Sequence, residues 1–117
     1  MTTRFKTNQW TYKNQPVDLV LIRHGESESN ISKARGQDRS QISGDFAERH
    51  TSKYRLTDVG RMQAKMTGEY IQRELGDFDI HYTSEYVRAC ETAACLELPG
   101  VVHWEMSHLL RDKVWDL

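Results

Sequence analysis

Apolar residues occur in two patterns along the chain, and these patterns predict strands that alternate with helices. Short apolar runs rich in β-branched and aromatic residues predict three strands, at residues 17–23, 78–83 and 101–106. A longer stretch, residues 57–75, carries apolar side chains at helical spacing instead. A short helix is expected after Gly25, beginning near Glu26 or Ser27.

The clearest helix covers residues 57–75. Thr57 is its expected N-cap and Gly76 its expected stop. We expect its apolar stripe to face the core; the stripe consists of Val59, Met62, Met66, Tyr70 and Ile71. Ser84 can cap a second helix that runs to about Leu98.

Two polar segments lie outside this alternation. Residues 1–16 are polar, with Trp10 and Tyr12 alternating as in a strand, and they predict an N-terminal arm or edge strand. Residues 36–54 lack any apolar period and predict a long loop with a brief helix around Phe46.

The length of 117 residues suits one modest domain, which we place at residues 17–117. Strand, helix, strand, helix, strand is the order of an α/β fold with a parallel sheet. Ligands of such sheets bind at the carboxyl ends of the strands, where helices begin. Three junctions meet there: Arg23, His24 and Gly25; Ser84, Glu85 and Arg88; and His108, Arg111 and Asp112.

Two arginines and a histidine at one sheet edge predict an anion pocket. The planar guanidinium groups of Arg23 and Arg88 suit phosphate in particular. His24 can then act as a nucleophile that carries a phosphoryl group, and Asp112 can protonate the leaving oxygen. The other expected binding residues follow the histidine closely: Gly25, Ser27 and Asn30.

The same residues have a plainer interpretation. Arg23 and His24 can simply end a strand, while Arg88 pairs with Glu85 or Glu91 on a solvated helix face. Spacing alone supports the two interpretations equally.

Composition narrows the class of protein. Sixteen Lys and Arg against seventeen Asp and Glu give a net charge of -1 without a basic stripe, which argues against nucleic acid as a partner. The longest apolar run, 19–22, is far shorter than the roughly 20 residues that cross a bilayer, and the polar residues 1–15 lack the apolar segment that is typical of a signal peptide. Cys90 and Cys95 point to different helix faces and should not form a disulfide. We expect a cytoplasmic protein without metal, cofactor or membrane association.

Four segments together resemble the histidine phosphatase superfamily, which includes the cofactor-dependent phosphoglycerate mutases. LIRHGESESN (21–30) is similar to its opening signature, and YRLTDVGRMQA (54–64) to its LT..G..QA helix start. YTSEYVRACETA (82–93) resembles the S...R..ET segment, and HLLRDKVW (108–115) the LLRERDWG stretch. Order and spacing agree over residues 19–115. The resemblance implies a three-layer α/β/α fold with a mainly parallel sheet.

The resemblance also implies roles for single residues. His24 would be the phosphoryl-accepting nucleophile, with Arg23 and Arg88 as the phosphate clamp. Asn30 matches a polar residue that touches the phosphate. Asp112 stands where most relatives carry a proton-donating glutamate.

The chain departs from the family in two places. Val114 and Asp116 replace an acidic residue and a glycine beside the expected proton donor, which makes Glu105 a second candidate. A late second histidine of the family, on a strand between the first two core strands, has no match before Leu117. We therefore expect a gap in the sheet, with three explanations open: a fragment of a longer protein, a strand supplied by a second copy in a homodimer, or lost catalysis.

These features predict hydrolysis of a phosphate ester on a small molecule, through a phosphohistidine. A phosphatase is favoured over a mutase, because nothing in the sequence indicates a closed pocket that keeps water from the phosphoenzyme. The alternative is a truncated, inactive relative that binds phosphate or a phosphorylated ligand. A purely structural domain is the third interpretation. The one candidate specificity segment is the loop at residues 36–54.

Overall fold

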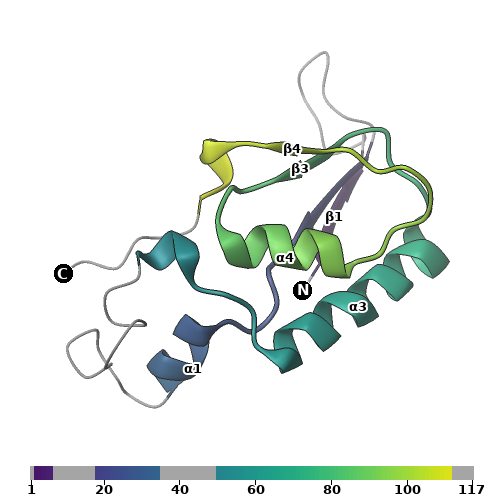
Figure 1. Cartoon of the computed structure of the whole chain (residues 1–117). Helices are drawn as coiled ribbons and strands as arrows, with labels where there is room; N and C mark the ends of the chain where they lie inside the picture. Colours follow the sequence, from purple (N-terminus) through teal and green to yellow (C-terminus); the bar gives the residue numbers. More distant parts are fainter. Residues whose placement is uncertain (1, 7–17, 35–49, 112–117) are drawn as a thin grey trace.

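The computed structural model describes residues 2–6, 18–34 and 50–111, which form the short strands and helices of an α/β protein (Figure 1). The strands are β1 (Thr2–Lys6), β2 (Asp18–Ile22), β3 (His81–Thr83) and β4 (Trp104–Met106). The helices are α1 (Glu28–Ala34), α3 (Asp58–Tyr70) and α4 (Val87–Cys95). Short helical turns are η3 (Thr51–Lys53), η4 (Ile71–Leu75) and η5 (His108–Leu110). Trp10, Tyr12 and most of the expected loop lie outside the described residues.

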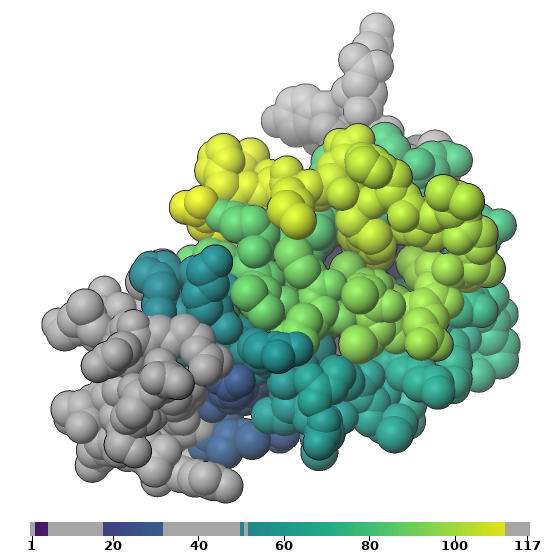
Figure 2. All heavy atoms as spheres, in the orientation of Figure 1, coloured from purple at the N-terminus to yellow at the C-terminus, as the bar shows by residue number. Residues whose placement is uncertain are grey.

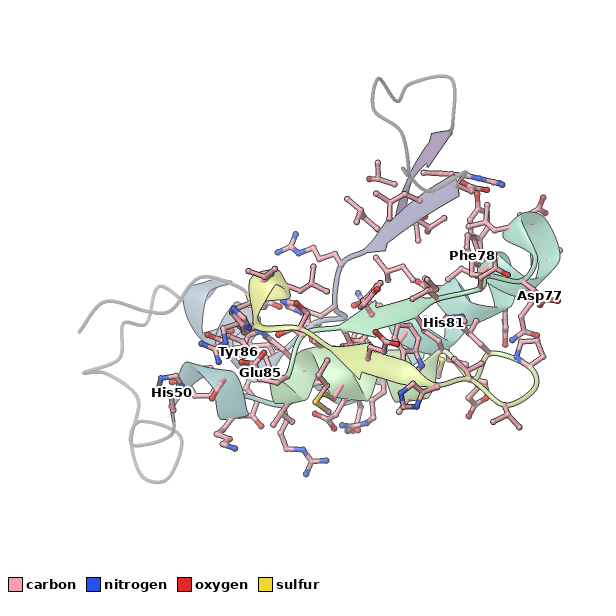
Figure 3. All side chains as sticks on the ribbon, turned by 90° about the horizontal axis from the view of Figure 1, so that it is seen from above. His50, Asp77, Phe78, His81, Glu85 and Tyr86 are labelled. Carbon is pink, nitrogen blue, oxygen red and sulfur yellow. The ribbon has the colours of Figure 1, made fainter. Side chains whose placement is uncertain are left out.

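Among the described residues, the strands pair as two separate two-stranded sheets. β1 runs antiparallel to β2, as an edge strand near the N-terminus would. β3 runs parallel to β4, but only over three residue pairs, so both strands are shorter than the sequence predicted. Figure 3 shows the two pairs as separate ribbons. The parallel pairing is confirmed for β3 and β4, and the continuous sheet of a three-layer fold stays a prediction.

The helical run of α3 and η4 begins and ends where the sequence predicted, but its buried face differs from the prediction. Thr57 caps the helix by accepting a hydrogen bond from the Gly60 N–H, and Gly76, with φ of +81°, ends the helical run after η4. The buried face consists of small residues: Gly60, Ala64, Thr67 and Gly68. The predicted core stripe was wrong except for Ile71, because these apolar side chains are exposed: Val59, Met62, Met66 and Tyr70.

Close helix packing explains which face of α3 is buried. A Cβ atom on Gly68 would collide with the carbonyl of Leu96, just after α4, so only a glycine permits this approach. α3 and α4 lie side by side in Figure 1, and Figure 2 shows α3 at the surface of the molecule. The small side chains thus set the distance between the helices, and the long apolar ones point away from α4.

The second helix begins later and ends earlier than the sequence predicted. Ser84 accepts a hydrogen bond from the Tyr86 N–H and so stabilises a turn, after which α4 starts at Val87. Cys90 and Cys95 are free thiols, as predicted. The buried apolar residues gather around α3 and α4: Tyr54, Leu56, Ala64, Ile71, Tyr86 and Leu96. Within the described residues, no helix is long and apolar enough to cross a membrane.

Candidate active site

The turn at residues 23–26 follows β2 and packs directly against α3. A Cβ atom on the buried Gly25 would collide with the carbonyl of Gly60, and one on Gly60 would collide with the carbonyl of Glu26. The absence of a side chain at Gly25 therefore permits close contact with α3, and a role of Gly25 in phosphate binding stays a prediction.

Hydrogen bonds fix the turn at the N-terminus of α3. The Thr57 N–H donates to the Glu26 carbonyl at 2.9 Å, and the Thr57 hydroxyl donates to the Glu26 carboxylate at 2.8 Å. The Glu26 N–H donates to Gln63 Oε1 at 2.8 Å. On the other side, the Gly25 N–H donates to the hydroxyl of Thr92 in α4 at 3.2 Å. Both helices thus hold the backbone of the turn.

The imidazole of His24 has a defined orientation. Its Nδ1 lies 2.7 Å from the carbonyl oxygen of Gly25. Because a carbonyl only accepts hydrogen bonds, Nδ1 must carry the proton, and the lone pair of the neutral ring is then on Nε2. A lone pair on the outer nitrogen is what a nucleophilic histidine needs.

One cleft, of about 970 Å³, is lined by the predicted cationic residues. Its polar lining includes Arg23, His24, Ser84, Arg88 and Arg111. Arg88 is only 3% exposed, and its guanidinium carbon lies 4.8 Å from the centre of the Tyr86 ring. Such a buried cation over an aromatic face is not on a solvated helix surface, which contradicts the plainer interpretation of Arg88.

Ser27 and Asn30 lie beside the turn but are not among the described residues that line the cleft. Ser27 is fully buried, and its N–H and hydroxyl donate to Asn30 Oδ1 at 3.0 and 3.1 Å. The two side chains thus close the first turn of α1. Their role in phosphate binding stays a prediction.

The third junction is only partly described, because Asp112 lies outside the described residues. Arg111 lines the cleft and forms an ion pair with Glu85, which Figure 3 labels next to Tyr86 before α4. A hydrogen bond from its own backbone N–H, together with Arg111, lowers the pKa of Glu85. Glu105 is exposed on β4 and does not line the cleft.

Sequence reasoning missed the supporting role of Glu91. Its carboxylate accepts hydrogen bonds at 3.0 Å from the Leu56 N–H and from the Arg55 side chain. Leu56 forms a β-bridge with Ser27, and the Arg55 carbonyl accepts from the Glu28 N–H at 2.9 Å, so Glu91 anchors the segment that holds the start of α1. The sequence held one signal for this role, because Glu91 and Thr92 lie about one helical turn after Arg88.

The same cleft separates β2 from β3, since residues of both strands line it. Several of its apolar side chains are exposed, among them Leu21, Ile80 and Tyr82. The cleft lies between the two strands where the resemblance predicts a gap in the sheet.

Among the described residues, no group of three or more His, Cys, Asp or Glu side chains could hold a metal ion. The family model of the histidine phosphatase superfamily (branch 1) matches residues 19–115. This match covers most of the chain, and the protein belongs to that superfamily. No solved structure matches the chain.

Proposed function

We propose that the protein hydrolyses phosphate monoesters of small molecules through a phosphohistidine. The lone pair of His24 Nε2 attacks phosphorus, and the bond from phosphorus to the ester oxygen breaks as Asp112 donates a proton to that oxygen. Water then attacks phosphorus of the phosphohistidine and gives a proton to the Asp112 carboxylate, while the bond from phosphorus to His24 Nε2 breaks, so that inorganic phosphate leaves and the imidazole regains its lone pair. No metal or cofactor enters these steps.

The observation that carries this proposal is the shared cleft of Arg23, His24 and Arg88, with the lone pair of His24 on Nε2. Two guanidinium groups can balance the charge of a phosphate and of the transition state. The N-terminus of α4, where Arg88 lies, adds its partial positive charge. Within the proposal, Gly25, Ser27 and Asn30 support the pocket from the side of the turn.

The test is phosphate release from an aryl phosphate by the chain and by His24→Ala. We expect the substitution to abolish turnover with the fold intact, and intact-mass measurement on the unsubstituted chain to detect a phosphorylated form. His103→Ala, which removes an exposed histidine outside the cleft, is the matched control and should keep full activity. Turnover retained in His24→Ala would refute the assignment. Saturable phosphate binding without turnover would favour the inactive relative instead.

We also propose that a strand from a second copy of this chain fills the cleft between β2 and β3. Among the described residues, β2 pairs only with β1 and β3 only with β4, so each strand has an edge without a ladder partner. Such edges, next to apolar side chains, accept an added strand. Exchange between two copies would close a symmetric dimer, joining the strands into one mainly parallel sheet of the three-layer fold.

Light scattering of the purified chain tests this dimer. We expect a dimer for the unsubstituted chain and a monomer for Leu21→Asp, because a charge on the cleft wall opposes strand insertion. A proven monomer with a sharp, cooperative melting transition would contradict the proposal, since a lone chain with an open cleft should be only marginally stable. The low cysteine content, two in 117 residues, supports the expected cytoplasmic location.

A further inference from the structure

We propose that Thr92 is a positioning residue, which holds the nucleophile turn in register with the arginine clamp. This inference rests on the proposed function and concerns how the same site is assembled. The evidence is a continuous set of hydrogen bonds that runs from the imidazole of His24 to the backbone of Arg88.

The hydroxyl of Thr92 uses both of its hydrogen-bonding functions. It donates to the Arg88 carbonyl, one helical turn earlier in α4, at 2.7 Å. That bond fixes the hydroxyl proton, so a lone pair of the oxygen is left for the Gly25 N–H, which donates to it at 3.2 Å. Thr92 is only 4% exposed, and water therefore has little access to replace either bond.

Gly25 links Thr92 to the proposed nucleophile, His24. Its N–H is held by Thr92, and its carbonyl accepts from His24 Nδ1 at 2.7 Å. The contact with Gly60 prevents the glycine from moving toward α3. The ring of His24 is thus oriented by a backbone whose position is set by α4, the same helix that carries Arg88.

Loss of the Thr92 hydroxyl should affect the reaction more than it affects binding. Thr92→Val keeps the side-chain shape but leaves the buried Gly25 N–H without an acceptor. The turn then shifts relative to Arg88, and a displacement of the order of 1 Å at a nucleophile lowers the rate by about 100-fold. KM should stay unchanged, because both arginines remain.

The experiment compares Thr92→Val, Thr92→Ser and Thr67→Val. We expect Thr92→Val to lower kcat by about 100-fold at unchanged KM, and Thr92→Ser, which keeps the hydroxyl, to stay near the unsubstituted chain. Thr67→Val, at a buried threonine of α3 outside this hydrogen-bond chain, controls for the loss of a buried hydroxyl. Equal effects of Thr92→Val and Thr92→Ser, or of Thr92→Val and Thr67→Val, would overturn the proposal.

Amide hydrogen exchange separates this proposal from the proposed activity. The Gly25 amide should be protected in the unsubstituted chain and in Thr92→Ser, and should exchange about tenfold faster in Thr92→Val, as one lost buried hydrogen bond implies. This readout needs no turnover, so an inactive chain with a protected Gly25 amide refutes only the phosphatase. An unprotected Gly25 amide in the unsubstituted chain refutes the role of Thr92, even if Thr92→Val does not fold.

Discussion

The turn at residues 23–26 and the cleft beside it differ in how their backbone groups find partners. The N–H groups of Gly25 and Glu26 donate to side chains of α4 and α3, and both carbonyls accept hydrogen bonds as well. In the cleft, β2 and β3 each have one edge without a ladder partner among the described residues. The geometry at His24 therefore depends on local polar contacts between neighbouring elements, whereas the facing edges of β2 and β3 have no such contacts to a neighbouring strand within the described residues.

The strongest test of the turn is Gly25→Ala. The new methyl group meets the carbonyl of Gly60, which cannot move without α3, and such overpacking should cost about 3 kcal/mol of unfolding free energy. Urea unfolding curves of the variant and of the unsubstituted chain measure this loss of unfolding free energy. Gly100→Ala is the control, because Gly100 has φ of +79° but open space around it, and strain alone should cost about 1 kcal/mol. Equal losses would mean that the Gly60 contact is not tight.

Glu91→Ala tests the segment that holds Ser27, the residue directly after the turn. It leaves the buried Leu56 N–H without its acceptor, at a cost of about 2 kcal/mol. Glu91→Gln keeps an oxygen that can accept this bond and should lose less. Unfolding curves of both variants measure the difference, and an equal loss would show that the negative charge matters and the hydrogen bond to Leu56 does not.

A smaller effect is expected from the ion pair between Glu85 and Arg111, at the rim of the cleft. The pKa of Glu85 is lower in the folded chain than its ordinary value of 4.5. Its contribution to stability is therefore fully present above the unfolded pKa and is lost as the pH falls through the depressed folded value. Stability measured from pH 6 downward should fall less steeply in Glu85→Gln than in the unsubstituted chain. Glu69→Gln, on the exposed side of α3, is the control.

The smallest effect is expected inside the cleft. Ile80 is 61% exposed on its wall, so Ile80→Ala should change the unfolding free energy of the monomer by less than about 0.5 kcal/mol. Leu96→Ala, at a buried residue that also lines the cleft, should cost about 3 kcal/mol. Dilute samples keep the chain monomeric for this comparison. A large loss for Ile80→Ala would show that the cleft is already filled.

Local signals in the sequence predicted where the helical run of α3 and η4 begins and ends. Thr57 and Gly76 act on their own helix ends, so their roles could be inferred without the rest of the fold. Arg23 and His24 directly follow a strand, and Arg88 lies in the first turn of a helix. The predicted alternation of strands and helices put such positions at one edge of the sheet, and all three residues line the same cleft.

The buried face of α3 could not be predicted in this way. Apolar periodicity favoured Met62 and Met66, whereas Gly60 and Gly68 decide which face approaches the rest of the chain. Close approach of two backbones depends on tertiary packing, and it has no signature in hydrophobicity. Ser27 is a similar case, because its position suited either a ligand or a helix start, and its bonds to Asn30 serve the helix start.

The exposed methionines of α3 can show whether another molecule covers this face. Met62 and Met66 are 59% and 61% exposed, so mild peroxide should convert both to sulfoxides in the isolated chain. Anything that covers this face, whether a second copy or another protein, would slow that oxidation. Peptide mass spectrometry after a brief peroxide treatment therefore maps the surroundings of α3 in cell extracts without any label.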